Sequence, residues 1–222
     1  MLILGVDTSG KDASIALVKF EQAHARTLEV VALEGGTFSA QLVPDISDLL
    51  NRQGVRKPNI DGFAVVSGPG SFTGLRVGLA AIKALAEVLQ KPIAAVSLLE
   101  AVVRASGMQG NVVAALDASR GEVYAADFQV SGSQATISNQ RLLPLAEFIS
   151  GNNSQIVTPD GKIADLIREK GLRLTLIDRP RADTIARLGF EKIHAGEVTK
   201  PETLDANYIR RSDAEARKSG WY

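Results

Sequence analysis

The sequence predicts an α/β fold made of two similar halves, and three observations support this. The chain has 222 residues, enough for one large domain or two small ones. Short apolar segments bounded by Gly, Pro, Asp and Ser alternate with segments of helical periodicity. An apolar strand followed by Asp-x-Ser occurs twice, at Asp7 and at Asp117, 110 positions apart. Asp and Ser are common turn residues, so one copy would mean little. Two copies half a chain apart favour a duplicated domain.

The first half is predicted to hold three strands, a helix, a fourth strand and a second helix. Alternating apolar residues mark the strands, and Gly54 is expected to end the first helix. That helix carries apolar residues at helical spacing. In chain order these elements are expected at residues 2–6, 13–18, 28–33, 38–53, 60–66 and 73–90.

The second half repeats this order. Strands are expected at residues 112–116, 123–130 and 155–158, a helix at 145–150, and another helix after Gly161. The Gly-rich segment at residues 106–110 is the expected link. The predicted domains are therefore residues 1–106 and 107–222.

The most informative segment is a glycine-rich loop between a predicted strand and a predicted helix. Its glycines would let backbone amides face a bound anion at the helix N-terminus, so a phosphate site is one interpretation. The loop matches neither the P-loop nor the dinucleotide fingerprint. The other interpretation is a tight turn that packs closely on its neighbours. The segment reads Ser67-Gly68-Pro69-Gly70-Ser71-Phe72-Thr73-Gly74-Leu75-Arg76.

The helix after this loop is apolar over most of its surface. Its polar side chains fall in a stripe roughly 60° wide at 100° per residue. A helix of this kind is buried on several sides, either inside its own chain or by another chain. One flank is bulky and the other is slim enough for a second helix to approach closely. The bulky flank has Leu75, Leu79, Ile82 and Ala86, and the slim flank has Val77, Ala80, Ala84 and Val88.

The composition argues against several classes of protein. Twenty-five basic and 25 acidic residues balance, whereas a chain that grips RNA alone shows a clustered basic footprint. The sequence has no cysteine and only two histidines, His24 and His194, so a thiolate or His-x-x-x-His metal site is not expected. No apolar segment approaches the length of about 20 residues that spans a bilayer. The N-terminus lacks the basic region of a signal peptide, and we expect a cytoplasmic protein.

Four phrases, in order along nearly the whole chain, resemble the TsaB (YeaZ) family, the accessory proteins of tRNA threonylcarbamoyladenosine (t6A) biosynthesis in bacteria. Ser119 stands where the family usually has the first Arg of Asp-Ala-Arg-Arg. The matching phrases are Gly5-Val6-Asp7-Thr8-Ser9, Gly68-Pro69-Gly70-Ser71-Phe72-Thr73-Gly74-Leu75-Arg76, Asp117-Ala118-Ser119-Arg120-Gly121-Glu122-Val123-Tyr124 and, more weakly, Tyr208-Ile209-Arg210.

The resemblance implies the actin/Hsp70/sugar-kinase (ASKHA) fold, built from two ribonuclease-H-like halves. It implies a non-catalytic subunit that binds and activates a TsaD-like transferase, which modifies adenosine 37 of tRNA. A TsaE-like ATPase would join the complex, and the free chain would form a homodimer. Tethering of tRNA would occur only through the complex. ATP and metal are expected on the partner subunits, with no cofactor on this chain and no membrane contact.

The resemblance also guides the choice of site residues. No catalytic residue and no metal ligand is expected. A nucleotide site, if retained, would use Asp7, Thr8, Ser9, Gly68, Gly70, Ser71 and Asp117. The partner-binding residues are expected on the two helices of the first half: Leu42, Ile46, Leu49, Val77, Ala80, Ala84 and Val88.

Two enzyme classes are the alternatives. A metallopeptidase would need paired histidines, and these two lie 170 positions apart. A stand-alone ATP-dependent phosphotransferase or ATPase of the same fold would use Asp7 and Asp117 around metal-bound phosphate. Enzymes of that kind generally need substrate-binding insertions, and both halves here are short. The basic pairs Arg179/Arg181 and Arg210/Arg211 and the final Trp221-Tyr222 have no assigned role.

Overall fold

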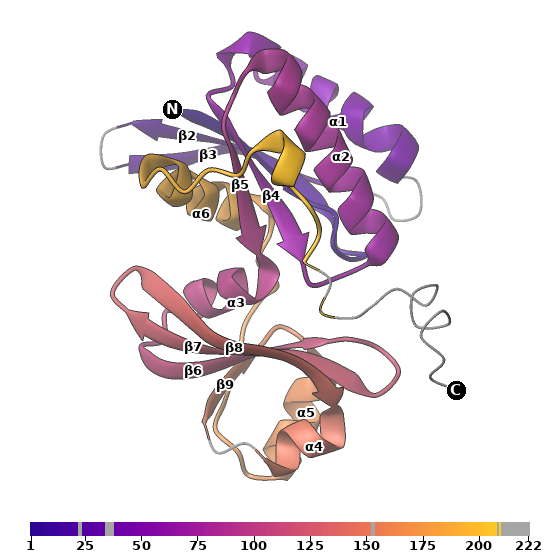
Figure 1. Cartoon of the computed structure of the whole chain (residues 1–222), viewed down its shortest axis with the longest axis vertical. Coiled ribbons are helices and arrows are strands. Elements are labelled where there is room, and N and C mark those ends of the chain that lie inside the picture. Colours follow the sequence, from indigo (N-terminus) through magenta and orange to yellow (C-terminus); the bar gives the residue numbers. More distant parts are fainter. Residues whose placement is uncertain (22–23, 34–37, 152–153, 208, 210–222) are drawn as a thin grey trace. The chain divides into compact units, whose positions relative to one another are not determined.

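Two compact units make up the computed structural model, which describes residues 1–21, 24–33, 38–151, 154–207 and 209 (Figure 1). Each unit holds one mixed sheet of five strands, which confirms the predicted α/β class. Unit 1 is built from residues 1–97 and 180–207, and unit 2 from residues 98–179.

The sheet of unit 1 has the strand order β3-β2-β1-β4-β5. The strand β1 is antiparallel to β2 and parallel to β4. Helices α1 and α2 lie on one side of the sheet and α6 on the other (Figure 1). The elements are β1 (Leu2–Asp7), β2 (Ser14–Glu21), β3 (His24–Ala32), α1 (Phe38–Arg52), η1 (Lys57–Asn59), β4 (Gly62–Gly68), α2 (Phe72–Leu89), β5 (Ile93–Ser97), α6 (Ala182–His194) and η2 (Pro201–Thr203).

Helix α6 packs closely on the sheet of unit 1 although it comes from the far end of the chain. A methyl group on Gly5 of β1 would overlap the carbonyl oxygen of Ala182, and one on Gly189 would overlap Ala64 of β4. The amide of Ala182 also donates a hydrogen bond of 3.0 Å to the hydroxyl of Ser14. These small residues let the helix approach the sheet, so α6 is an integral part of unit 1.

The sheet of unit 2 has the equivalent order β10-β9-β6-β7-β8. Helices α4 and α5 cover one face through a core that includes Phe148, Ile163 and Ile167, and α3 packs against β6 to β9. The elements are α3 (Leu98–Ser106), β6 (Gly110–Asp117), β7 (Glu122–Ser131), β8 (Gln134–Pro144), α4 (Leu145–Ser150), β9 (Gln155–Thr158), α5 (Gly161–Glu169) and β10 (Leu174–Leu176).

The two units share an irregularity at corresponding positions of their hairpins. The β2–β3 ladder shifts register between Leu17 and Val18, and the β7–β8 ladder shifts between Asp127 and Phe128. The offset is 110 positions, as for Asp7 and Asp117. Bulges are specific features of a fold, so this agreement supports duplication.

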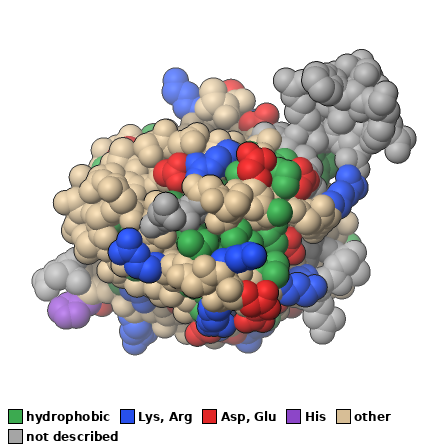
Figure 2. All heavy atoms as spheres, turned by 90° about the horizontal axis from the view of Figure 1, so that it is seen from below, with side chains coloured by type: hydrophobic (Ala, Val, Ile, Leu, Met, Phe, Trp, Pro, Cys, Tyr) green, Lys and Arg blue, Asp and Glu red, His purple; other side chains and the backbone are tan. Residues whose placement is uncertain are grey.

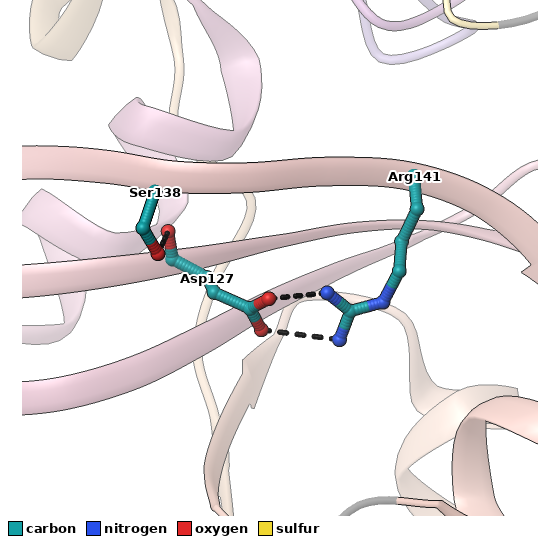
Figure 3. Close-up of polar contacts among 3 residues, drawn as sticks. All are labelled: Asp127, Ser138 and Arg141. Carbon is teal, nitrogen blue, oxygen red and sulfur yellow. Dashed lines mark hydrogen bonds and ion pairs between the residues drawn. The ribbon is translucent and has the colours of Figure 1, made fainter.

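The second bulge brings three polar side chains together. The hydroxyl of Ser138 donates a hydrogen bond of 3.2 Å to the backbone carbonyl of Asp127, and Arg141 forms a two-pronged ion pair with the Asp127 carboxylate (Figure 3). A bidentate Arg–carboxylate pair fixes geometry as well as charge. These contacts hold the hairpin in its bulged register.

The predicted division at residues 106 and 107 differs from the observed one. Helix α3 belongs to unit 2, and residues 180–207 return to unit 1. The predicted link lies inside unit 2, where the Gln109 side-chain amide bonds to both backbone groups of Gly132 at the hairpin tip. The third helix of each half thus packs on the sheet of the other half, which a linear cut of the sequence cannot represent.

Candidate partner-binding surface and glycine loop

The glycine loop joins β4 to α2 and rests on the turn that follows β1. The amide of Ser71 donates a hydrogen bond of 2.6 Å to the carbonyl of Ser9. The hydroxyl of Ser71 caps α2 by accepting a hydrogen bond of 3.2 Å from the amide of Gly74. Two of the amides that could face an anion are therefore used inside the protein.

The glycines of α2 provide room for the β1 turn. A methyl group on Gly74 would overlap the carbonyl oxygen of Thr8, and one on Gly78 would overlap the Thr8 hydroxyl. The Thr8 hydroxyl donates a hydrogen bond of 2.7 Å to the carbonyl of Gly74. A methyl group on Gly70 would likewise overlap the backbone carbonyl oxygen of Ser9. This geometry favours the tight-turn interpretation of the loop over the phosphate interpretation.

The residues of the predicted nucleotide site divide between the two units. Those of unit 1 lie together, because the glycine loop contacts the turn after β1. Asp7, Thr8 and Ser9 are buried, with 0%, 1% and 2% exposure. In the second unit Asp117 is exposed. Their nucleotide-binding role stays a prediction.

The two aspartates nevertheless begin turns of the same kind. Oδ1 of Asp7 accepts a hydrogen bond of 2.8 Å from the amide of Ser9, and Oδ1 of Asp117 accepts one of 2.8 Å from the amide of Ser119. Asp and Ser thus act as turn residues at both places. The repeated Asp-x-Ser phrase therefore marks a turn that is present in both units, whatever chemistry either copy retains.

Helix α2 buries its bulky flank and exposes its slim flank. Leu75, Leu79, Ile82 and Ala86 are buried together with Gly74 and Gly78. On the opposite side Ala80 and Ala84 are exposed, Val77 is half-buried, and Val88 is 80% exposed. The slim flank is therefore open in a single chain, as a surface for a partner must be.

Charged side chains border this flank along one side. Arg76 and Glu87 are exposed and Lys83 is half-buried. The Arg76 guanidinium lies 3.7 Å from the centre of the Phe72 ring, a cation–π contact. The contact holds Arg76 at the start of the helix. The surface thus combines a small-residue centre with a charged edge, the usual layout of a protein interface.

The structure corrects the prediction for α1. Leu42, Ile46 and Leu49 are only 1%, 2% and 0% exposed. These side chains form the core of unit 1 and are not available to a partner. The exposed apolar residue of this helix is Val43, at 49% exposure, and Ala40 is also exposed. The sequence pattern did not identify Val43 as an exposed apolar residue, because the only feature that marks it is its position outside the apolar repeat.

The two histidines lie in unrelated settings. His24 is exposed at the start of β3. His194, at the end of α6, stacks on Phe190 with ring centres 5.7 Å apart, and Phe190 stacks on Phe20 with ring centres 3.9 Å apart. Within the described part of the chain, no three His, Asp or Glu side chains are grouped as metal ligands would be. Among the described helices, none is long and apolar enough to cross a membrane.

Comparison with known proteins matches the chain to proteins of tRNA threonylcarbamoyladenosine biosynthesis. The family model of the tRNA N6-adenosine threonylcarbamoyltransferase TsaD matches residues 35–195. The tRNA threonylcarbamoyladenosine biosynthesis protein TsaB of Bacillus subtilis is 30% identical, and the match covers 98% of this chain and 97% of that protein. TsaB of Escherichia coli is 26% identical, with 99% of each chain covered.

A solved structure gives the same result. A Pseudomonas aeruginosa protein, described as uncharacterized with similarity to peptidase YEAZ, superposes with a TM-score of 0.76 at 26% identity. The superposition covers 94% of this chain and 99% of that one. With this fold and these sequence matches, the chain belongs to the TsaB (YeaZ) family of tRNA threonylcarbamoyladenosine biosynthesis proteins.

Proposed function

We propose that the chain is a non-catalytic subunit that binds and activates a TsaD-like threonylcarbamoyltransferase for t6A37 modification of tRNA. Its binding surface is the slim flank of α2. The observation that carries the proposal is the exposure of Ala80, Ala84 and Val88, beside the half-buried Val77, along one side of a helix. Small residues let a second helix approach closely, and burial of Val88 on docking favours association.

The proposal includes the rest of the complex. A TsaE-like ATPase joins the two subunits, and ATP and metal act on the partners. The free chain covers the same flank by forming a homodimer. Contact with tRNA comes through the assembled complex in the cytoplasm. The balanced charge of the chain supports this last point, because a subunit that held tRNA by itself would need a basic surface.

The competing function is a stand-alone phosphotransferase or ATPase. The duplicated aspartate turns favour it, because enzymes of this fold use such carboxylates around phosphate. The geometry of the glycine loop weighs against it, because the amides of Ser71 and Gly74 are already bonded within unit 1. We therefore prefer the subunit function.

An assay of the isolated chain separates the two functions. We expect no ATP hydrolysis above background and no ATP-dependent rise in melting temperature, because the subunit leaves the chemistry to its partners. The Asp117→Asn variant is the matched control. Asp117 is exposed, and the new amide oxygen can still accept from Ser119. Steady turnover by the wild type that this substitution removes would overturn the subunit function.

A further inference from the structure

A second apolar surface lies on unit 2, formed by α4, α5 and the segment after α5. Figure 2 views the molecule from the side where α4 and α5 lie and shows hydrophobic side chains gathered there, bordered by charged ones. The structure has an open groove of about 680 Å³ at these helices. Its lining residues are Leu145, Ala146, Ile149, Ser150, Leu166, Lys170 and Leu172.

The groove has a fixed floor and an exposed rim. Ile149 and Leu172 are only partly buried and pack against the core of unit 2, which holds Phe148 and Ile167. Leu166 is 40% exposed and lies beside the buried face of α5. The core keeps the floor in shape, so the groove does not need a ligand to form.

The lining carries a single charge, that of Lys170. The nearby Asp165 forms its ion pair with Arg168, at 3.1 Å. Within the described residues Lys170 makes no ion pair, and its side chain is exposed. A lysine beside an apolar groove can lay its aliphatic stem on that surface and present its ammonium group at the rim. The groove thus combines an apolar body with one positive end.

We propose that this groove binds a monomeric anionic amphiphile, with its hydrocarbon chain on Leu145, Ile149, Leu166 and Leu172 and its carboxylate at Lys170. The volume falls in the range of small-molecule sites. The charge complements an anion. A symmetric second copy would present the same lining, which holds no acidic side chain to meet Lys170, so a second copy fits less well.

Decanoate is the probe that tests this proposal. Isothermal titration of the full chain, at decanoate concentrations below micelle formation, should show one saturable site with a dissociation constant on the order of 0.1 mM. Leu166→Asp should weaken binding at least about tenfold, because it removes apolar surface and adds a negative charge. Lys170→Gln should weaken decanoate binding roughly threefold to fivefold and leave decanol binding unchanged.

The matched control is Leu176→Asp, because Leu176 is 44% exposed on β10 of the same unit and lies outside the groove lining. It should bind decanoate as the wild type does, with both variants folded by circular dichroism. Absence of saturable binding would overturn the proposal, and so would equal losses in Leu166→Asp and Leu176→Asp. Binding to anionic vesicles without binding of monomeric decanoate would also overturn it. None of these outcomes depends on the proposed function.

Discussion

Replacement of Gly74 by alanine should destabilise the protein by about 1–2 kcal/mol, although alanine is normally the better helix former. In an exposed helix, Gly to Ala adds stability of about 1 kcal/mol. Here the new methyl group would overlap the carbonyl oxygen of Thr8. A backbone atom cannot rotate away as a side chain can, so α2 or the β1 turn must move. Overpacking of this kind costs roughly 1–3 kcal/mol of stability, occasionally more. The shift would also strain the hydrogen bond between Thr8 and Gly74.

Urea denaturation measures this effect, and Gly161→Ala is the matched control. Gly161 is the first residue of α5, and a methyl group there would meet no atom within 4 Å. We expect Gly161→Ala to unfold at the same urea concentration as the wild type or a slightly higher one, and Gly74→Ala at a clearly lower one. Equal midpoints for Gly74→Ala and the wild type would show that the loop has spare room. The tight-turn interpretation would then be wrong.

The second large effect is expected from Ala80→Glu/Ala84→Glu on α2. Both positions are exposed in a single chain, so the variant should fold, but it should lose the proposed homodimer and the stability that this association adds. In a docked complex the two carboxylates would be buried against the partner without a counter-charge, which costs several kcal/mol. We expect the affinity for the TsaD-like partner to fall by at least about a thousandfold, which corresponds to about 4 kcal/mol.

Co-purification and titration with the TsaD-like partner measure this loss. The control Gln129→Glu/Ala195→Glu adds the same charge at two exposed positions that are not part of α2 and should bind normally. Undiminished association of a folded Ala80→Glu/Ala84→Glu variant would remove the slim flank from the interface. The proposed function would then need another surface.

The sequence predicts α2 well, because its periodicity and its glycines carry most of the information. The predicted helix, residues 73–90, is offset by one position from the observed Phe72–Leu89. In the structure the bulky flank is buried and the slim flank lies on the surface. A long helix with one narrow polar stripe has few ways to lie on a sheet, so its pattern fixes its orientation.

The packing of α1 and α6 shows what a sequence pattern leaves open. The spacing of Leu42, Ile46 and Leu49 predicts a buried face but does not say whether the same chain or another one covers it. The structure shows that its own core does. The apolar face of α6 likewise does not indicate which of the two sheets the helix packs against. The close fit of Gly5 against Ala182 and of Gly189 against Ala64 shows that the helix belongs to unit 1.

The groove of unit 2 could not be predicted at all. Helix α4 has six residues, too few for a reliable periodic pattern. Leu166 lies off the buried row of α5 and looks in the sequence like one ordinary exposed leucine. The groove exists because Leu145 and Ile149 of α4 lie beside Leu172 from the segment after α5, and that arrangement is a property of the tertiary structure.

Reconstitution of t6A formation tests the central claim most directly. Unmodified tRNA, the TsaD-like and TsaE-like proteins and a threonylcarbamoyl donor are incubated with and without this chain, and t6A is quantified by mass spectrometry. We predict robust modification with the wild type and with Asp117→Asn. Omission of the chain, or use of Ala80→Glu/Ala84→Glu, should lower the rate at least about tenfold, because loss of about 1.4 kcal/mol of transition-state stabilisation has that effect. Equal modification without the chain, or modification by the chain alone, would contradict the account.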